Sequence, residues 1–235
     1  MQLFPDGNLV VDQNDNLFGT APYGGYGAAE NGLVFMMSKD GKGWHETILH
    51  SFNDNDGINP DNTLVMDAAG NLYGTTTGGG VSYQQGVVFK LSPPAGGDKV
   101  RGRWKFSLLY QFTGGADGGG PTNLALDAAG NVIGVAASGG ASGNGVVYQL
   151  SPTLSGPWTQ TVLWNFAGGT DGSGPVGSIV VNGSNIFGAT GEGGDSNNDG
   201  TVFGISRWYG RGRLPPALNP RSGPLARSRW QSRNK

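Results

Sequence analysis

Residues 67–74 read DAAGNLYG, and variants of this stretch return three times elsewhere in the chain. They are DQNDNLFG at 12–19, DAAGNVIG at 127–134 and NGSNIFG at 182–188. The final glycines of the four copies are 55, 60 and 54 residues apart. Repeats of this length that hold short strands are typical of β-propeller blades and related arrays. The spacing therefore predicts an all-β fold, a β-propeller of four repeats with up to four antiparallel strands each.

The same order of elements recurs within each repeat. An apolar run after a proline predicts a first strand, and the Asp-containing turn behind it closes a hairpin. The central glycine of the second strand indicates a bend or a close approach. The third strand reads GLVF, GVVF, GVVY or GTVF, and the fourth aligns without gaps at 44–52, 104–112 and 158–166. Alternate residues of a strand lie on one face, so the fourth strand of the first repeat should carry Trp44, Ile48, His50 and Phe52 on the same face. This face should pack between neighbouring blades.

The repeats divide the chain into a propeller domain and a tail. The blades lie near 5–59, 60–120, 121–174 and 175–206, and together they form one domain over residues 1–206. The fourth repeat lacks a fourth strand, so the sequence predicts an incomplete ring of blades. Residues 207–235 are rich in Arg and Pro, which predicts a disordered tail. The body has 7 basic and 17 acidic residues, a formal charge of −10, whereas the tail has eight basic residues and no acidic one. Contact with nucleic acid is expected only through this tail.

Four segments carry a resemblance to a known family: DAAGNLYGTTTGGG (67–80), GVVFKLSP (86–93), WTQTVLWNF (158–166) and GGTDGSGP (168–175). Together they resemble the GloVer tandem repeat of secreted or surface-anchored bacterial proteins, over nearly all of residues 5–206. The resemblance implies a propeller in an extracellular or cell-surface setting, and it brings no established activity. The chain departs from the repeat after Ser206, and MQLFPDGN at its start has no signal-peptide pattern. Both departures are expected of a fragment, or of a tail from a shifted reading frame.

Catalytic motifs are missing from the sequence. There is no cysteine, hence no disulfide framework and no thiol nucleophile. No GxSxG elbow occurs. The glutamates Glu30, Glu46 and Glu192 are scattered, whereas glycoside hydrolysis needs paired carboxylates. No stretch is apolar enough to span a membrane. We therefore predict no catalytic residues, and no cofactor apart from calcium.

Calcium is suggested by one loop. Asp195, Asn197 and Asp199 precede Gly200, which places oxygen ligands at alternate positions as in calcium-binding loops. No distal Glu follows, so the loop is not an EF-hand. Other acidic residues recur between the fourth strand and the next proline, namely Asp54, Asp56, Asp117 and Asp171. Turn chemistry explains these residues without any metal, because Asp, Asn and Gly dominate turns.

The two histidines and three tyrosines have structural and functional interpretations. His45 and His50 point to opposite faces of a strand, so they cannot share one metal ion. His50 replaces Tyr110 and Trp164 of the other repeats, which predicts packing rather than acid–base chemistry. Loop tyrosines are candidate stacking platforms for a sugar, or ordinary loop residues; they are Tyr23, Tyr26 and Tyr83.

These observations favour a non-catalytic, extracellular or surface-displayed propeller that binds carbohydrate or a surface protein through its loops. One alternative is a propeller enzyme that acts on polysaccharide. It would be favoured by polar residues that do not repeat from blade to blade. A second alternative is a truncated fragment without independent function, because a missing strand leaves an edge exposed.

Overall fold

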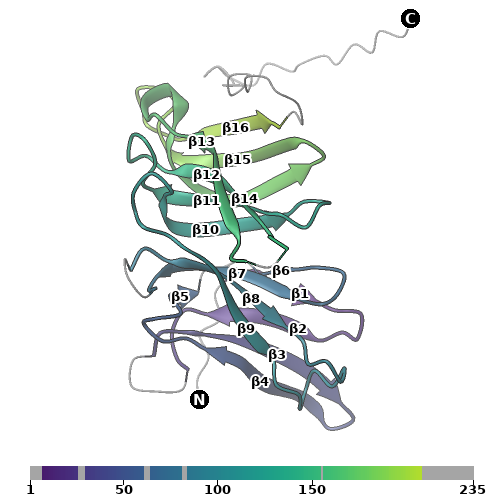
Figure 1. The fold of residues 1–235 in the computed structure, drawn as a ribbon. Coiled ribbons are helices and arrows are strands. Elements are labelled where there is room, and N and C mark those ends of the chain that lie inside the picture. Colours follow the sequence, from purple (N-terminus) through teal and green to yellow (C-terminus); the bar gives the residue numbers. More distant parts are fainter. Residues whose placement is uncertain (1–6, 26–29, 61–63, 81–83, 155, 208–235) are drawn as a thin grey trace, which may run out of the picture.

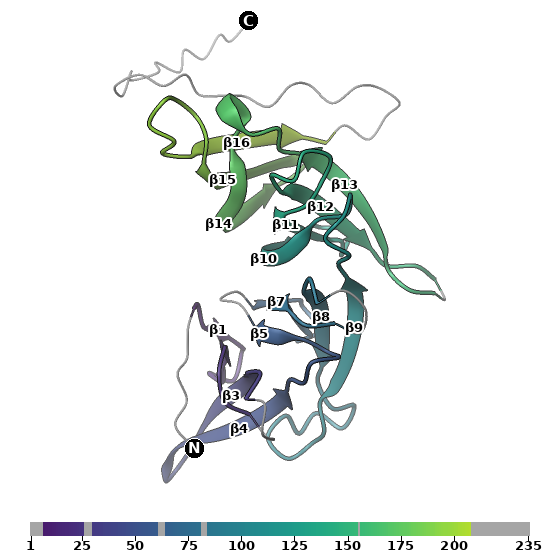
Figure 2. The same ribbon diagram turned by 90° about the vertical axis from the view of Figure 1, so that its left-hand side faces the viewer.

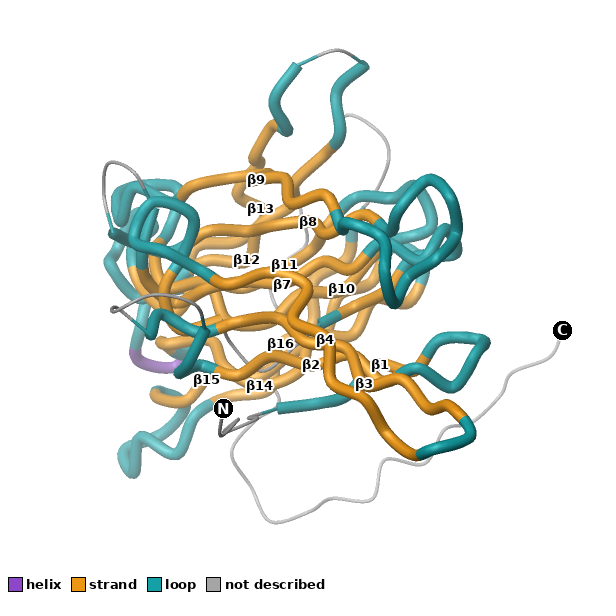
Figure 3. The backbone as a smooth tube through the Cα atoms, turned by 90° about the horizontal axis from the view of Figure 1, so that it is seen from below, coloured by secondary structure: helices purple, strands orange, loops and turns teal. Residues whose placement is uncertain are grey.

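The computed structural model describes residues 7–25, 30–60, 64–80, 84–154 and 156–207. Over these residues the protein is all-β, with four antiparallel sheets and a single 3-10 turn, η1 (Gly169–Asp171). Figure 3 shows the strands and their connecting loops, with η1 as the one helical segment. No helix in the described part of the chain is long and apolar enough to cross a membrane. The predicted all-β fold class is confirmed.

Each sheet corresponds to one sequence repeat. Sheet one comprises β1 (Val10–Val11), β2 (Leu17–Ala21), β3 (Leu33–Asp40) and β4 (Gly43–Ser51). Sheet two comprises β5 (Ile58–Pro60), β6 (Val65–Met66), β7 (Leu72–Gly78), β8 (Val87–Ser92) and β9 (Lys105–Gln111). Sheet three comprises β10 (Gly119–Leu126), β11 (Val132–Ser138), β12 (Val146–Ser151) and β13 (Thr159–Asn165). Sheet four comprises β14 (Ser173–Asn182), β15 (Asn185–Glu192) and β16 (Thr201–Ser206). As described, sheet four thus has one strand fewer than sheets one and three.

The repeated turn is closed by its aspartate. Asp67 Oδ1 accepts the backbone N–H groups of Ala69 and Asn71, each at 2.9 Å. Gly70 has φ +79°, a conformation that a residue with a Cβ atom adopts at a cost. Asp127 accepts the corresponding N–H groups in sheet three. The turn joins two paired strands and fixes their register.

The central glycine of each repeat makes room for an aromatic ring. A Cβ atom on Gly74 would lie 2.5 Å from Cζ of Phe89, which comes from the paired third strand. Three other pairs repeat this arrangement: Gly19 with Phe35, Gly134 with Tyr148 and Gly188 with Phe203. The close approach expected from the sequence is therefore that of a side-chain ring lying across the glycine.

A β-bulge in the fourth strands corrects one expectation. His50 pairs with Val34 while Ile48 pairs with Phe35, so Leu49 is an extra residue in β4. Because neighbouring residues of β3 face opposite sides, the bulge also turns Ile48 and His50 to opposite faces. The prediction that these two side chains share one face is wrong. The prediction that His45 and His50 point to opposite faces is wrong for the same reason, because their partners Ser38 and Val34 lie on one face of β3. The same register shift occurs in sheets two and three.

The sheets pack face to face in chain order. Inner strands of neighbouring sheets are in contact, β2 with β5, β7 with β10, and β10 with β14. Figures 1 and 2 show the four sheets following one another along an arc, with sheet one and sheet four at its opposite ends. Three apolar clusters fill the spaces between successive sheets. At about 1.5–3 kcal/mol per buried large side chain, these clusters are the main source of stability.

The first residue of the predicted tail is part of the folded body. Arg207 is buried, and its guanidinium group lies 3.1 Å from Asp127 Oδ2 and donates to Gln149 Oε1 at 2.7 Å. Asp127 belongs to the repeated turn of sheet three. Arg207 therefore ties the end of sheet four to the preceding sheet. The rest of the predicted tail, 208–235, lies outside the described residues.

Candidate functional site

The recurring loop aspartates act as turn residues. A ring on each fourth strand approaches the aspartate of the turn that follows it, at 3.0 to 3.3 Å. The three pairs are His50 Nε2 with Asp56 Oδ2, Tyr110 O–H with Asp117 Oδ2, and Trp164 Nε1 with Asp171 Oδ2. Since three different rings make the same contact, the contact is structural. His50 also stacks on Phe106 with ring centroids 4.0 Å apart, which confirms its predicted packing role.

The Asp195 loop has an internal turn bond. Asp195 Oδ1 accepts the N–H of Asn197 at 2.8 Å, and Asn198 Oδ1 accepts the N–H of Gly193 at 2.6 Å. Among the described residues, no three His, Cys, Asp or Glu side chains gather as a metal site. Calcium at Asp195, Asn197 and Asp199 stays a prediction, and calorimetric titration with calcium tests it.

Of the three tyrosines chosen as stacking platforms, Tyr23 lies within the described residues. Tyr23 is exposed at the end of β2. Tyr26 and Tyr83 lie outside the described residues. Stacking of a sugar on these rings also stays a prediction.

The strongest candidate site is a polar groove of about 510 Å³ between sheets one and two. One wall is the β3–β4 hairpin with the turn before β2, and the other is a loop of sheet two. The lining residues are Asn14, Asn16, Ser38, Lys39, Asp40, His45, Gly97, Asp98, Lys99, Val100 and Arg101. All but Gly97 and Val100 are polar or charged. We call this site the insertion groove, because the loop 96–103 is an insertion that the other repeats lack.

Hydrogen bonds hold the insertion in a defined shape. Lys99 Nζ reaches across to sheet one and donates to Asp12 Oδ2 at 2.8 Å. The Lys99 carbonyl accepts the indole N–H of buried Trp104 at 3.0 Å. Asp98 Oδ1 accepts the N–H groups of Val100 and Arg101. The groove is thus built from a loop docked on a rigid scaffold, where functional residues are commonly found.

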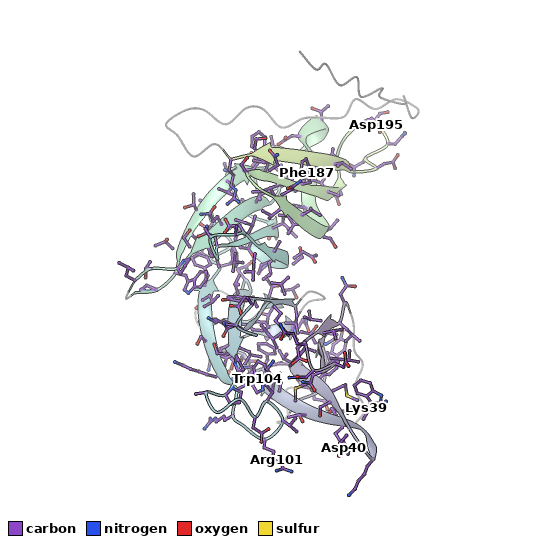
Figure 4. The ribbon with its side chains drawn as sticks, turned by 90° about the vertical axis from the view of Figure 1, so that its right-hand side faces the viewer. Lys39, Asp40, Arg101, Trp104, Phe187 and Asp195 are labelled. Atoms are coloured by element: carbon purple, nitrogen blue, oxygen red, sulfur yellow. The ribbon has the colours of Figure 1, made fainter. Side chains whose placement is uncertain are left out.

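The β3–β4 hairpin contributes a second pair of ionisable side chains to the groove, Asp40 and His45. His45 Nε2 lies 2.9 Å from Asp40 Oδ1, and both side chains are about half exposed. The backbone N–H of Lys42 and the His45 ring lower the pKa of Asp40, so this carboxylate is ionised at neutral pH. Arg101 lines the groove from the opposite wall, and Figure 4 labels Asp40 and Arg101 at the sheet-one end of the molecule.

A buried aspartate anchors the groove floor. Burial acts to raise the pKa of Asp12, but hydrogen bonds from Lys99, Asn16 and two backbone N–H groups outweigh it and keep the pKa below its usual value. Lys99 is therefore neutralised by Asp12. Lys39 Nζ lies over the Trp44 ring, 6.0 Å from its centroid, on the face of sheet one that points away from the groove. Arg101 is therefore the cation that remains to meet a ligand, beside a His–Asp pair that can transfer a proton.

The sequence alone pointed elsewhere. The insertion 96–103 stands out as a break in the repeat, but loop insertions cost little stability and need no function. The missed signal is its composition, because GGDKVRGR brings four charged residues into an otherwise charge-poor chain. These residues do not repeat from blade to blade, which is the feature expected of a catalytic rather than a structural site.

Comparison with protein families identifies the repeat. The model of the Gloeobacter/Verrucomicrobia repeat family matches residues 5–211, which agrees with the suspected GloVer resemblance. No curated protein matches the chain.

Several solved structures share the general architecture. An exo-1,5-alpha-L-arabinanase from a bovine ruminal metagenomic library has a TM-score of 0.42 and 12% identity, over 87% of this chain and 74% of that one. An endo-1,4-beta-xylanase from Bacteroides thetaiotaomicron has a TM-score of 0.45 and 13% identity, over 92% and 76%. A thermostable family-43 glycoside hydrolase has a TM-score of 0.45 and 14% identity, over 94% and 76%.

These structures correct the first functional hypothesis. They are named as an arabinanase, a xylanase and a glycoside hydrolase, and none is named as a non-catalytic binding module. The hypothesis of a non-catalytic binding module is therefore withdrawn, and the alternative of a propeller enzyme is taken up as a proposal below. At this level of identity and overlap they locate no active site in this chain. The site has to be argued from the residues of the chain itself.

Proposed function

The chain belongs to the Gloeobacter/Verrucomicrobia repeat family. From the geometry of the insertion groove we propose that it is an extracellular enzyme that cleaves an acidic polysaccharide there. The observation that carries the proposal is the Asp40–His45 pair, 2.9 Å apart, in a groove that also presents Arg101. The extracellular setting comes from the family resemblance and belongs to the same proposal.

The charges of the groove select the class of substrate. Arg101 is exposed and comes from the wall opposite the Asp40–His45 pair. Guanidinium and ammonium groups bind carboxylates with charge-assisted hydrogen bonds. A chain of uronic acids offers such a carboxylate on each sugar, and the Asn and Ser side chains of the walls can bind its hydroxyl groups. A neutral polysaccharide would offer Arg101 no such carboxylate.

The His–Asp pair supplies the proton transfer. Asp40 holds one nitrogen of His45, which leaves Nδ1 as the second nitrogen that can exchange a proton. In the proposed step, His45 removes the proton from the ring carbon beside the sugar carboxylate. The electrons of that C–H bond form a C=C bond, the glycosidic C–O bond breaks, and its oxygen leaves with the bonding electrons and takes up a proton. Arg101 offsets the charge that builds on the carboxylate.

The test is product release from defined polysaccharides by the full chain. With polyuronates we expect new reducing ends and ultraviolet-absorbing unsaturated products, and neither with xylan or arabinan. His45→Gln and Asp40→Asn should each lower the rate about 10²–10⁴-fold. Glu46→Gln is the matched control, since Glu46 is exposed on the same hairpin but does not line the groove. No product from any polysaccharide, or full activity of the Asp40 and His45 variants, would contradict the proposal.

A further inference from the structure

The two faces of each sheet have different partners. We call the face that packs on the following sheet the leading face, and the face that packs on the preceding sheet the trailing face. The leading face carries Phe18 in sheet one, Tyr73 in sheet two and Ile133 in sheet three. The trailing face carries Leu64 in sheet two, Leu124 in sheet three and Ile179 in sheet four. The apolar clusters join Phe18 with Leu64, Tyr73 with Leu124, and Ile133 with Ile179. One kind of interface is thus repeated three times within the chain.

Sheet four leaves its leading face uncovered. Phe187 is 41% exposed, whereas its equivalents Phe18, Tyr73 and Ile133 are at most 5% exposed. Val202 is 60% exposed, whereas Val34, Val88 and Val147 at the same repeat position are fully buried. Val176 and Val180 are exposed too, and strand pairing places them on the same face as Phe187 and Val202.

Sheet one leaves part of its trailing face uncovered. Ala21, Leu33 and Phe35 on this face are buried, but three other large side chains are exposed. Leu9 is 51% exposed, against 3% for Leu64 and Leu124 at the equivalent position. Trp44 is 48% exposed, against 6% for Trp104. Val11, which pairs with Leu17 on this face, is also exposed. Seven of the exposed large apolar side chains of the described residues therefore lie on these two end faces.

The end faces are complementary in detail. Within the chain, Trp104 packs edge-on against Phe18 of the preceding sheet at 5.7 Å, and Trp158 packs against Tyr73 at 6.4 Å. Trp44 and Phe187 are the remaining members of this series, and neither has such a partner among the described ring pairs. Figure 4 labels Phe187 at the sheet-four end, and Figure 2 shows sheet one at the other end of the arc.

We propose that a second copy of this chain covers the leading face of sheet four with the trailing face of its own sheet one. The contact would repeat the internal sheet-to-sheet interface, with Trp44 of one copy on Phe187 of the other. Because the two surfaces differ, the association is head-to-tail and can continue to further copies or close into a ring. It involves neither Asp40 nor His45 and is independent of the proposed activity.

The test is sedimentation velocity of the full chain over a wide range of concentration. We expect oligomers that grow with concentration. Val202→Glu and Leu9→Glu each place a charge in the interface and should weaken association at least about tenfold. Leu154→Glu is the matched control, because Leu154 is fully exposed in a loop away from both faces, and it should associate as the unaltered chain does. Melting curves establish that all variants are folded.

Mixing the two interface variants separates head-to-tail contact from any other kind. The Val202→Glu chain keeps its trailing face, and the Leu9→Glu chain keeps its leading face. Their mixture should form a one-to-one dimer that grows no further, while each alone stays monomeric. A chain that is monomeric at every concentration would overturn the proposal. So would oligomers that survive both substitutions, or a mixture that fails to pair.

Discussion

At the scale of single residues, the central glycines explain why the repeat is so regular. Each lies under the aromatic ring of the third strand, and in sheets two to four this ring fills the space towards the preceding sheet. A methyl group at this position has no room, since the distance to the ring would be 2.4 to 2.6 Å in all four repeats. The repeat therefore conserves a pair of residues, one small and one aromatic, rather than a glycine alone.

Replacing Gly74 by Ala should destabilise the protein by about 1–3 kcal/mol, because Phe89 must leave its position in the packed core. Urea unfolding of the variant measures the loss. Gly96→Ala is the control, since a Cβ atom there meets nothing within 4 Å, and its free energy of unfolding should stay close to that of the unaltered protein. Equal stability of the two variants would show that the Phe89 ring does not lie against Gly74.

Arg207 provides a second residue-scale prediction. Asn131 and Arg207 donate hydrogen bonds that outweigh the effect of burial and lower the pKa of Asp127. A carboxylate with a lowered pKa adds stability above its unfolded pKa of about 4, and this stability is lost as the pH falls through the folded value. Arg207→Ala should cost about 3 kcal/mol at pH 7, because it leaves a buried charge without its partner.

The pH dependence distinguishes this ion pair from a packing effect. The difference in unfolding free energy between Arg207→Ala and the unaltered protein should shrink as the pH is lowered below about 4. Arg103→Ala removes an exposed charge and serves as the control, with little change at either pH. A loss that is the same at low and neutral pH would contradict an electrostatic role for Arg207.

At the scale of elements, the strands follow from the sequence and their tertiary contacts do not. The fourth strands expected at 44–52, 104–112 and 158–166 correspond to β4, β9 and β13 within one residue at each end. The bulge at Leu49 was missed, because period two alone cannot show where an extra residue enters. Lys99 and Asp12 are 87 residues apart in sequence, so their contact depends on how sheets one and two stack. The groove could therefore not be predicted from the sequence alone.

The insertion should loosen when its anchor is removed. Lys99→Met leaves Asp12 without its ammonium partner and frees the loop from sheet one. Hydrogen exchange of the amides in 97–102 should become faster, while the amides of β11 and β12 in sheet three keep their protection. Lys90→Met is the matched control, because Lys90 lies in sheet two but outside the groove. Unchanged exchange in the insertion would mean that Lys99 does not hold it.

At the scale of the whole molecule, an arc of four sheets leaves a groove between sheets one and two and two apolar faces at its ends. The groove lies on the leading side of sheet one, and the exposed apolar side chains lie on its trailing side. Binding of a substrate and association of copies are therefore separate properties. The sequence indicates the incomplete ring, but only the burial of equivalent residues shows which faces remain open.

Chemical-shift mapping with an oligomer of a uronic acid tests the insertion groove as the functional site most directly. The amides of 38–45 and 97–101 should shift as the acidic oligosaccharide is added, and a neutral xylo-oligosaccharide should leave them in place. Shifts confined to another part of the molecule, or none at saturating oligosaccharide, would contradict it.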